Sequence, residues 1–443
     1  PNDVPVGAVN HRGPWVLTVA NSSHDRVDGN PISVAGGPQN SPGVKGSGLG
    51  FTSTVTAQVA SAAALGNEFG CTSSGGFPAG SMTGRIALIQ RGPLPPGTAC
   101  GFLEKSNNAA AAGAVATVIY NHTLGPIPGA NTDGVTIPTV IMGRAPGYAI
   151  RDFLAGSPTA LMTVTTPEVR LIDPSIGDFL NASSLRGPNI PGNTTVGTNN
   201  YVGSDTTKPD ITGPGTNIYA AVSDVSGQFG FLTGTSMSSP HLAGAAALLR
   251  AVNPTWTVPE IKSALQMSAK QTGIKADGVN QWDADDVGNG RVDISLASRA
   301  GMVMNESFAN FLAANPVSAV DQVRVRALNL PSLRNTACTG VCTFVRTFRN
   351  TRSTPTTWFA RTGGAPAGTT ITVVPSSFTF NGGLAETQTV TITMTVNQPG
   401  GISALRFGEV RFTTTELFKS NFETELSIPD TRLTVGVTGT QAP

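Results

Sequence analysis

"GTSMSSPH", residues 234–241, is the stretch that decides what fold this chain should have. It places Ser236 directly after Gly234 and Thr235, where a helix over residues 236–252 is predicted to begin. A helix N-terminus presents free N–H groups and the positive end of the helix dipole. A negatively charged oxygen beside Ser236 would be stabilised there, with the Ser236 N–H as one donor. Ser236 is therefore a candidate nucleophile, although a serine in this position is more often only a helix cap.

The overall composition excludes several classes of partner. The 443 residues carry 28 Lys and Arg against 27 Asp and Glu, so the net charge of +1 offers no basic surface for nucleic acid or an anionic membrane. No apolar run approaches the roughly 20 residues that cross a membrane, and the first residues lack the pattern of a signal peptide. The 52 Gly and 32 Pro favour a loop-rich, strand-rich protein over a helical bundle.

The cysteine pattern indicates an oxidising environment. They fall into two separated pairs, without a CxxC spacing or a neighbouring histidine cluster: Cys71, Cys100, Cys338 and Cys342. We expect two local disulfides and hence an oxidising, secreted setting. Four free buried thiols are the alternative.

The first half of the chain divides into two predicted segments. Residues 1–44 contain the mostly apolar run 15–20, which is typical of a buried strand in a parallel sheet. Residues 45–165 follow a Gly- and Pro-rich linker and have a pattern of their own. That pattern predicts a small α/β domain with a strand at 85–92, a helix at 102–114 and strands at 115–121 and 137–142.

The second half also divides in two. Residues 166–305 are predicted to return to the first domain, with a strand, turn and strand in 208–221 and a second helix over 257–267. Thr257 and Glu260 have the spacing of a capping box, and Asp293 is placed to cap a short helix. Residues 306–443 carry alternating, β-branched runs separated by Gly-rich turns, which predicts a β-sandwich.

Residues 234–241 resemble the segment around the nucleophilic serine of the subtilisin-like serine proteases (subtilases), and four further segments resemble other parts of that family. The segments are ASSLRGPN (182–189), KPDITGPGTNIYAA (208–221), TVPEIKSALQMSA (257–269) and GNGRVDISLA (288–297). Residues 50–160 resemble the protease-associated domain that subtilases often carry, and the C-terminal region resembles a fibronectin type III-like domain. The resemblance implies an α/β fold: a subtilisin-like doubly wound parallel sheet whose N-terminal half is absent, with an inserted domain and a C-terminal sandwich.

The partners of the serine that the resemblance implies are missing from the sequence. The family's acid sits in a D-[ST]-G stretch and its base in a GHGTH-like stretch, and neither occurs here. His241 points roughly 140° away from Ser236 around the same helix, so it cannot act as the base. His11, His24 and His122 are expected to have surface or packing roles. Asn2 is a weak candidate for the second oxyanion donor, and we expect the true donor upstream.

The expected function is therefore a secreted endopeptidase that hydrolyses protein or peptide substrates through an acyl-enzyme on Ser236. The catalytic Asp and His would come from an N-terminal fragment of the same protease that is not in this sequence, and this chain alone would be inactive. The alternative is a non-catalytic binding or assembly protein built on the same scaffold.

Two minor patterns complete the expectations. Asp283, Asp285, Asp286 and Asp293 offer oxygens for a structural calcium ion, but we favour ordinary loop carboxylates and expect no other metal or cofactor. Glycosylation sequons begin at Asn21, Asn121, Asn181, Asn193 and Asn305.

Overall fold

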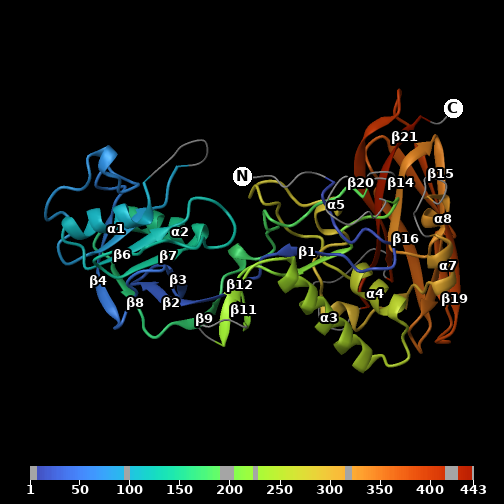
Figure 1. Cartoon of the computed structure of the whole chain (residues 1–443), viewed down its shortest axis with the longest axis horizontal. Helices are drawn as coiled ribbons and strands as arrows, with labels where there is room; N and C mark the ends of the chain where they lie inside the picture. Colours follow the sequence, from blue (N-terminus) through green and yellow to red (C-terminus); the bar gives the residue numbers. More distant parts are fainter. Residues whose placement is uncertain are drawn as a thin grey trace. The chain divides into compact units, whose positions relative to one another are not determined.

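The computed structural model describes residues 7–93, 100–189, 204–222, 228–314, 322–414 and 428–441. These residues belong to two compact units (Figure 1). The first comprises Pro1–Ser22 and Leu180–Pro443, and the second is Ser23–Phe179. The second unit is wider on both sides than the predicted insert at 45–165.

Strand pairing explains the wider borders. Strand β2 (Arg26–Val34) pairs with β8 (Leu161–Val164) and with β9 (Val169–Ile172). Residues 26–34 and 169–172, which lie outside the predicted insert, therefore belong to the sheet of the second unit. The predicted segments 166–305 and 306–443 fall largely into a single compact unit.

In the first unit, two parallel strands support the helix that begins beside Ser236. Strand β1 (Val19–Ser22) pairs in parallel with β10 (Ile211–Pro214), and helix α3 (Thr235–Val252) packs on them. The parallel strand and the helix are confirmed, but the strand begins later than predicted. Trp15 is 39% exposed in a turn, because Gly13 and Pro14 fold the chain back and the Val16 amide bonds to the Gly13 carbonyl.

Helix α3 is buried along one face only. Ser238, Leu242, Ala245 and Leu249 form the buried face. Leu248 and Val252, which lie four positions apart on the side of the helix that adjoins this face, are 61% and 64% exposed. The first unit therefore shows an apolar helix face to solvent.

The helix caps predicted from sequence are confirmed. Helix α4 (Val258–Met267) begins with the reciprocal capping box of Thr257 and Glu260. The Leu296 amide donates to Asp293 Oδ1 at 3.0 Å at the start of α6 (Ile294–Ala297). Two further short helices in this unit are α5 (Ala284–Val287) and, before the sandwich, α7 (Phe308–Ala313).

The C-terminal β-sandwich is confirmed. One sheet has the order β13 (Met302–Val303), β15 (Val341–Asn350), β19 (Thr387–Val396), β17 (Thr369–Val374). The other has the order β14 (Ser332–Thr339), β21 (Thr431–Thr440), β20 (Ile402–Thr413), β16 (Thr356–Gly364), β18 (Ser377–Phe380). Alternating residues of the two sheets fill one core around Phe348, Trp358 and Phe412. Helix α8 (Gln322–Ala327) contacts β14 and β15.

The second unit is an α/β domain, as predicted. Its eight-stranded sheet has the order β3, β7, β6, β5, β4, β8, β2, β9. The remaining strands are β3 (Ser41–Lys45), β4 (Val55–Ser61), β5 (Ile86–Gln90), β6 (Ala116–Tyr120) and β7 (Thr139–Met142). Helix α1 (Phe102–Ala111) packs with Ile89 and Ile119, and α2 (Arg144–Gly156) packs with Leu88 and Val118. Since neighbouring strand residues face opposite sides, the helices cover opposite faces.

Both predicted disulfides are present, Cys71–Cys100 and Cys338–Cys342, and no free cysteine remains. Within the described ranges, no helix has the length and apolar character needed to cross a membrane.

The two disulfides are expected to differ in their effect on stability. The Cys71–Cys100 bridge spans 29 positions and the Cys338–Cys342 bridge spans four. In the chain-entropy model, replacing the first pair by alanine lowers the free energy of unfolding by about 3–4 kcal/mol, and replacing the second by about 2 kcal/mol. Calorimetry of the two double variants measures this, and the reverse order would contradict it.

Candidate active site

Ser236 lies at the solvent-exposed N-terminus of α3. It is the second residue of the helix and its side chain is exposed. Neither its amide nor its hydroxyl makes a hydrogen bond within the described part of the chain. The amide is thus free to donate to a developing oxyanion, and the helix dipole favours negative charge at this end. The placement fits the predicted role of Ser236.

The carboxyl ends of β1 and β10 hold this helix end in place. The Gly215 amide donates to the Ser22 carbonyl at 3.0 Å, and the Gly234 amide donates to the Gly215 carbonyl at 2.8 Å. Ser238 Oγ, one turn into α3, donates to the Gly213 carbonyl at 3.1 Å. Ser236 therefore sits where open α/β sheets bind ligands, beyond the carboxyl ends of parallel strands.

Gly215 is the tightest point of this support. A Cβ atom at position 215 would lie 2.0 Å from Ser238 Oγ, 2.5 Å from Asn21 Oδ1 and 2.7 Å from the Gly234 carbonyl oxygen. Gly234 itself has an extended backbone, and a Cβ there meets only ordinary contacts beyond 3.6 Å. The glycine that the close approach requires is thus Gly215.

We expect Gly215→Ala to lower the free energy of unfolding by about 1–3 kcal/mol, because overpacking forces β10 and α3 apart. The same shift should displace Ser236 and slow its reaction. Gly244→Ala is the matched control, since a Cβ at the exposed Gly244 meets open space, and alanine favours a helix by about 1 kcal/mol. Urea unfolding of both variants tests this, and equal stability would contradict it.

The histidines do not supply a base to Ser236 in the first unit. His241 is exposed, and its Nδ1 lies 2.8 Å from the Met237 carbonyl oxygen of the preceding turn. His11 is exposed, and its carbonyl accepts a hydrogen bond from Thr18 Oγ1 at 2.7 Å. His24 and His122 belong to the other unit. Burial, with the charges of Arg91 and Lys105, lowers the pKa of His122. Asn2 lies outside the described residues.

An exposed aromatic cluster precedes the serine and was missed by the sequence analysis. It lies on the hairpin of β11 (Ile218–Ala221) and β12 (Phe229–Leu232). Tyr219, Phe229 and Phe231 are each more than half exposed, and the Tyr219 ring lies 5.9 and 5.0 Å from the two phenylalanine rings. The alternating F-G-F pattern before Gly234 was the available signal. The three rings thus form an exposed apolar cluster on this hairpin.

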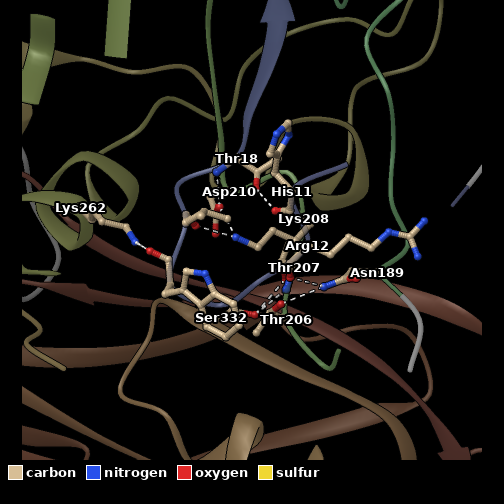
Figure 2. A network of polar contacts seen from close by, with 12 residues as sticks. His11, Arg12, Thr18, Asn189, Thr206, Thr207, Lys208, Asp210, Lys262 and Ser332 are labelled. Carbon is tan, nitrogen blue, oxygen red and sulfur yellow. Dashed lines mark hydrogen bonds and ion pairs between the residues drawn. The ribbon is translucent and has the colours of Figure 1, made fainter. Parts of the chain in front are cut away.

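A buried polar network supports the other ends of β1 and β10 (Figure 2). Lys208 is fully buried, and its Nζ donates to Asp210 Oδ2 at 2.5 Å and to the Val16 carbonyl at 2.8 Å. The Thr18 amide donates to the same carboxylate oxygen at 2.6 Å. The network fixes the register in which the two parallel strands enter the sheet.

The acidic residues of the loop 283–293 face cations of the chain itself. Lys275 Nζ lies 2.5 Å from Asp283 and 3.0 Å from Asp286, which also bonds to Arg186. Two further ion pairs, at 2.6 and 3.0 Å, are Asp285–Arg334 and Asp293–Lys270. The described residues contain no group of three or more His, Cys, Asp or Glu side chains arranged for a metal. The arrangement fits the structural interpretation of these carboxylates.

The sequons differ in accessibility. Asn21 and Asn121 are buried, whereas Asn305 is exposed. Asn193 lies outside the described residues.

Two family models and several known proteases match parts of this chain. The PA domain family matches residues 55–150, and a fibronectin type-III domain family matches residues 327–419. The minor extracellular protease Vpr of Bacillus subtilis is 30% identical over 230 residues, covering 51% of this chain and 25% of Vpr. The subtilisin-like protease SBT2.3 of Arabidopsis thaliana is 25% identical over 466 residues, covering 90% of this chain and 53% of SBT2.3.

This chain is similar in sequence to subtilisin-like proteases. It spans a quarter of Vpr and about half of the plant subtilisin-like protease. Among solved structures, the psychrophilic subtilisin-like protease Apa1 of Pseudoalteromonas sp. AS-11 matches with a TM-score of 0.33 at 15% identity, covering 63% of this chain and 50% of Apa1. The similarity to subtilisin-like proteases rests on the sequence matches.

Proposed function

We propose that this chain is part of a secreted serine endopeptidase in which Ser236 attacks the carbonyl carbon of a peptide bond. The observation that carries the proposal is the exposed Ser236 with a free amide at the N-terminus of α3, beyond the carboxyl ends of β1 and β10. Attack gives a tetrahedral intermediate, whose oxyanion accepts from the Ser236 N–H. Collapse leaves an acyl-enzyme on Ser236, which water then hydrolyses.

This reaction needs a base that accepts the Ser236 proton. Among the described residues of the first unit, no side chain is hydrogen-bonded to Ser236 in that role. We propose that a histidine and an aspartate from an N-terminal part outside this sequence act on the serine. The histidine takes the Ser236 proton and passes it to the leaving amine, while the aspartate orients the imidazole. An asparagine from the same part would be the second oxyanion donor.

Two exposed apolar surfaces support a covering partner. Leu248 and Val252 of α3 are more than half exposed, as are Tyr219, Phe229 and Phe231 of the hairpin beside Ser236. Apolar patches of this kind are rarely left uncovered on soluble proteins. The disulfides and the printed name of Vpr, an extracellular protease, support the secreted setting.

A second candidate is a non-catalytic binding or assembly protein. It is favoured by one observation, the lack of a hydrogen-bonded base at Ser236 within the described residues. The exposed aromatic hairpin and the PA domain would then be its contact surfaces.

Peptidase assays of the chain with and without an upstream segment distinguish the two candidates. We expect no hydrolysis of a denatured protein substrate by the chain alone, and hydrolysis when the upstream segment is co-expressed and co-purifies. A co-purified complex without hydrolysis would overturn the endopeptidase proposal and favour the binding protein.

A further inference from the structure

A small cavity in the first unit lies beside the polar network of Figure 2 and away from Ser236 in the chain. Its volume is about 20 Å³. A cavity needs about 10–15 Å³ on this measure to hold one water-sized group, so there is room for one small occupant. Helix α4 contributes Lys262 to the lining, and the segments before β1 and β10 contribute Val16, Lys208 and Asp210.

The charges that line this cavity do not balance. Its charged residues are Lys208, Lys262 and Asp210, so two ammonium groups face one carboxylate. Asp210 is already engaged, because its Oδ2 accepts from both Lys208 Nζ and the Thr18 amide. The nearest acid on α4, Glu260, is paired with Arg349 at 2.5 Å.

Lys262 has no anionic partner among the described residues. Its Nζ donates to the Trp15 carbonyl at 2.6 Å, and the other two protons of a charged ammonium have no acceptor there. The walls beside it include the apolar side chains of Met304 and Phe311. Burial lowers the pKa of Lys262 to about 8, partly offset by Asp210 and reinforced by Lys208. The Lys262 side chain is only partly exposed, so an anion beside it would stabilise its charged form.

We propose that this cavity binds one small monovalent anion, chloride in ordinary solution, between the ammonium groups of Lys262 and Lys208. The anion accepts the free protons of Lys262 and neutralises the excess positive charge. The site lies between α4 and the segments that precede β1 and β10. The bound anion therefore stabilises the packing of α4 against these two segments.

Bromide replaces chloride in such sites and can be located by its anomalous scattering. In crystals of this chain soaked in sodium bromide, we expect an anomalous peak in the cavity within hydrogen-bonding reach of Lys262 Nζ. No peak there, with bromide bound at other surface positions of the same crystal, would overturn the proposal.

Thermal unfolding gives an independent test at constant ionic strength. Replacing gluconate by 100 mM chloride should raise the Tm of the first unit by about 2 °C. Lys262→Met should abolish this response, Lys262→Arg should retain it, and Lys270→Met is the control, since Lys270 is already paired with Asp293. A chloride response that is unchanged in Lys262→Met, or absent from the parent chain, would contradict the anion site.

Discussion

Replacing Ser236 by alanine is expected to lower kcat/KM for peptide hydrolysis by the complemented enzyme by about 10⁶-fold. The loss is large because no other group can form the acyl-enzyme. The Tm should stay unchanged, because the exposed Ser236 hydroxyl makes no hydrogen bond within the described chain. Steady-state kinetics and thermal unfolding of the purified variant measure the two quantities separately.

Ser239 provides the matched control for this experiment. It is also an exposed serine of α3, but it lies three residues further into the helix than Ser236. It is therefore farther from the helix N-terminus that the strand ends hold in place. Ser239→Ala should retain activity within a factor of a few. Activity of Ser236→Ala within tenfold of the parent would show that another residue is the nucleophile.

The second large effect is expected at the buried ion pair that joins the sandwich to the α/β part of the first unit. Arg334 on β14 is fully buried and its Nη1 lies 2.6 Å from Asp285 Oδ1 on α5. Arg334→Met should lower the free energy of unfolding by about 3–5 kcal/mol, because it leaves the Asp285 carboxylate buried without a partner. Chemical denaturation measures the loss.

A double variant and an exposed pair make this prediction specific. Arg334→Met combined with Asp285→Leu removes both charges and should recover much of the lost stability. Arg411→Met removes a partly exposed partner of Glu409 in the same sandwich, and its cost should stay below about 1 kcal/mol. A double variant no more stable than Arg334→Met would contradict the argument from unpaired charge.

The features that could be predicted from sequence are those fixed by neighbouring residues. The capping box of Thr257 and Glu260 depends on residues three positions apart, and the cap at Asp293 depends on the turn that follows it. The helix that begins beside Ser236 and the strands of the sandwich are likewise visible in the local sequence, because their apolar residues recur with the period of a helix or of a strand.

The features that could not be predicted depend on contacts between distant parts of the chain. The border of the second unit is set by the pairing of β2 with β8 and β9, more than 120 positions away. The ion pair of Asp285 with Arg334 joins residues 49 positions apart, and nothing in the acidic loop itself indicates that partner. The same holds for Gly215, whose need for glycine arises from Asn21 and Ser238.

Fluorophosphonate labelling followed by peptide mapping tests the central claim most directly, because the reagent reacts only with an activated serine. With the upstream segment bound, we expect the label on the peptide that contains Ser236. The chain without that segment should stay unlabelled. Label on a different serine, or none on Ser236 in the intact complex, would contradict the account of Ser236 as the nucleophile of an endopeptidase.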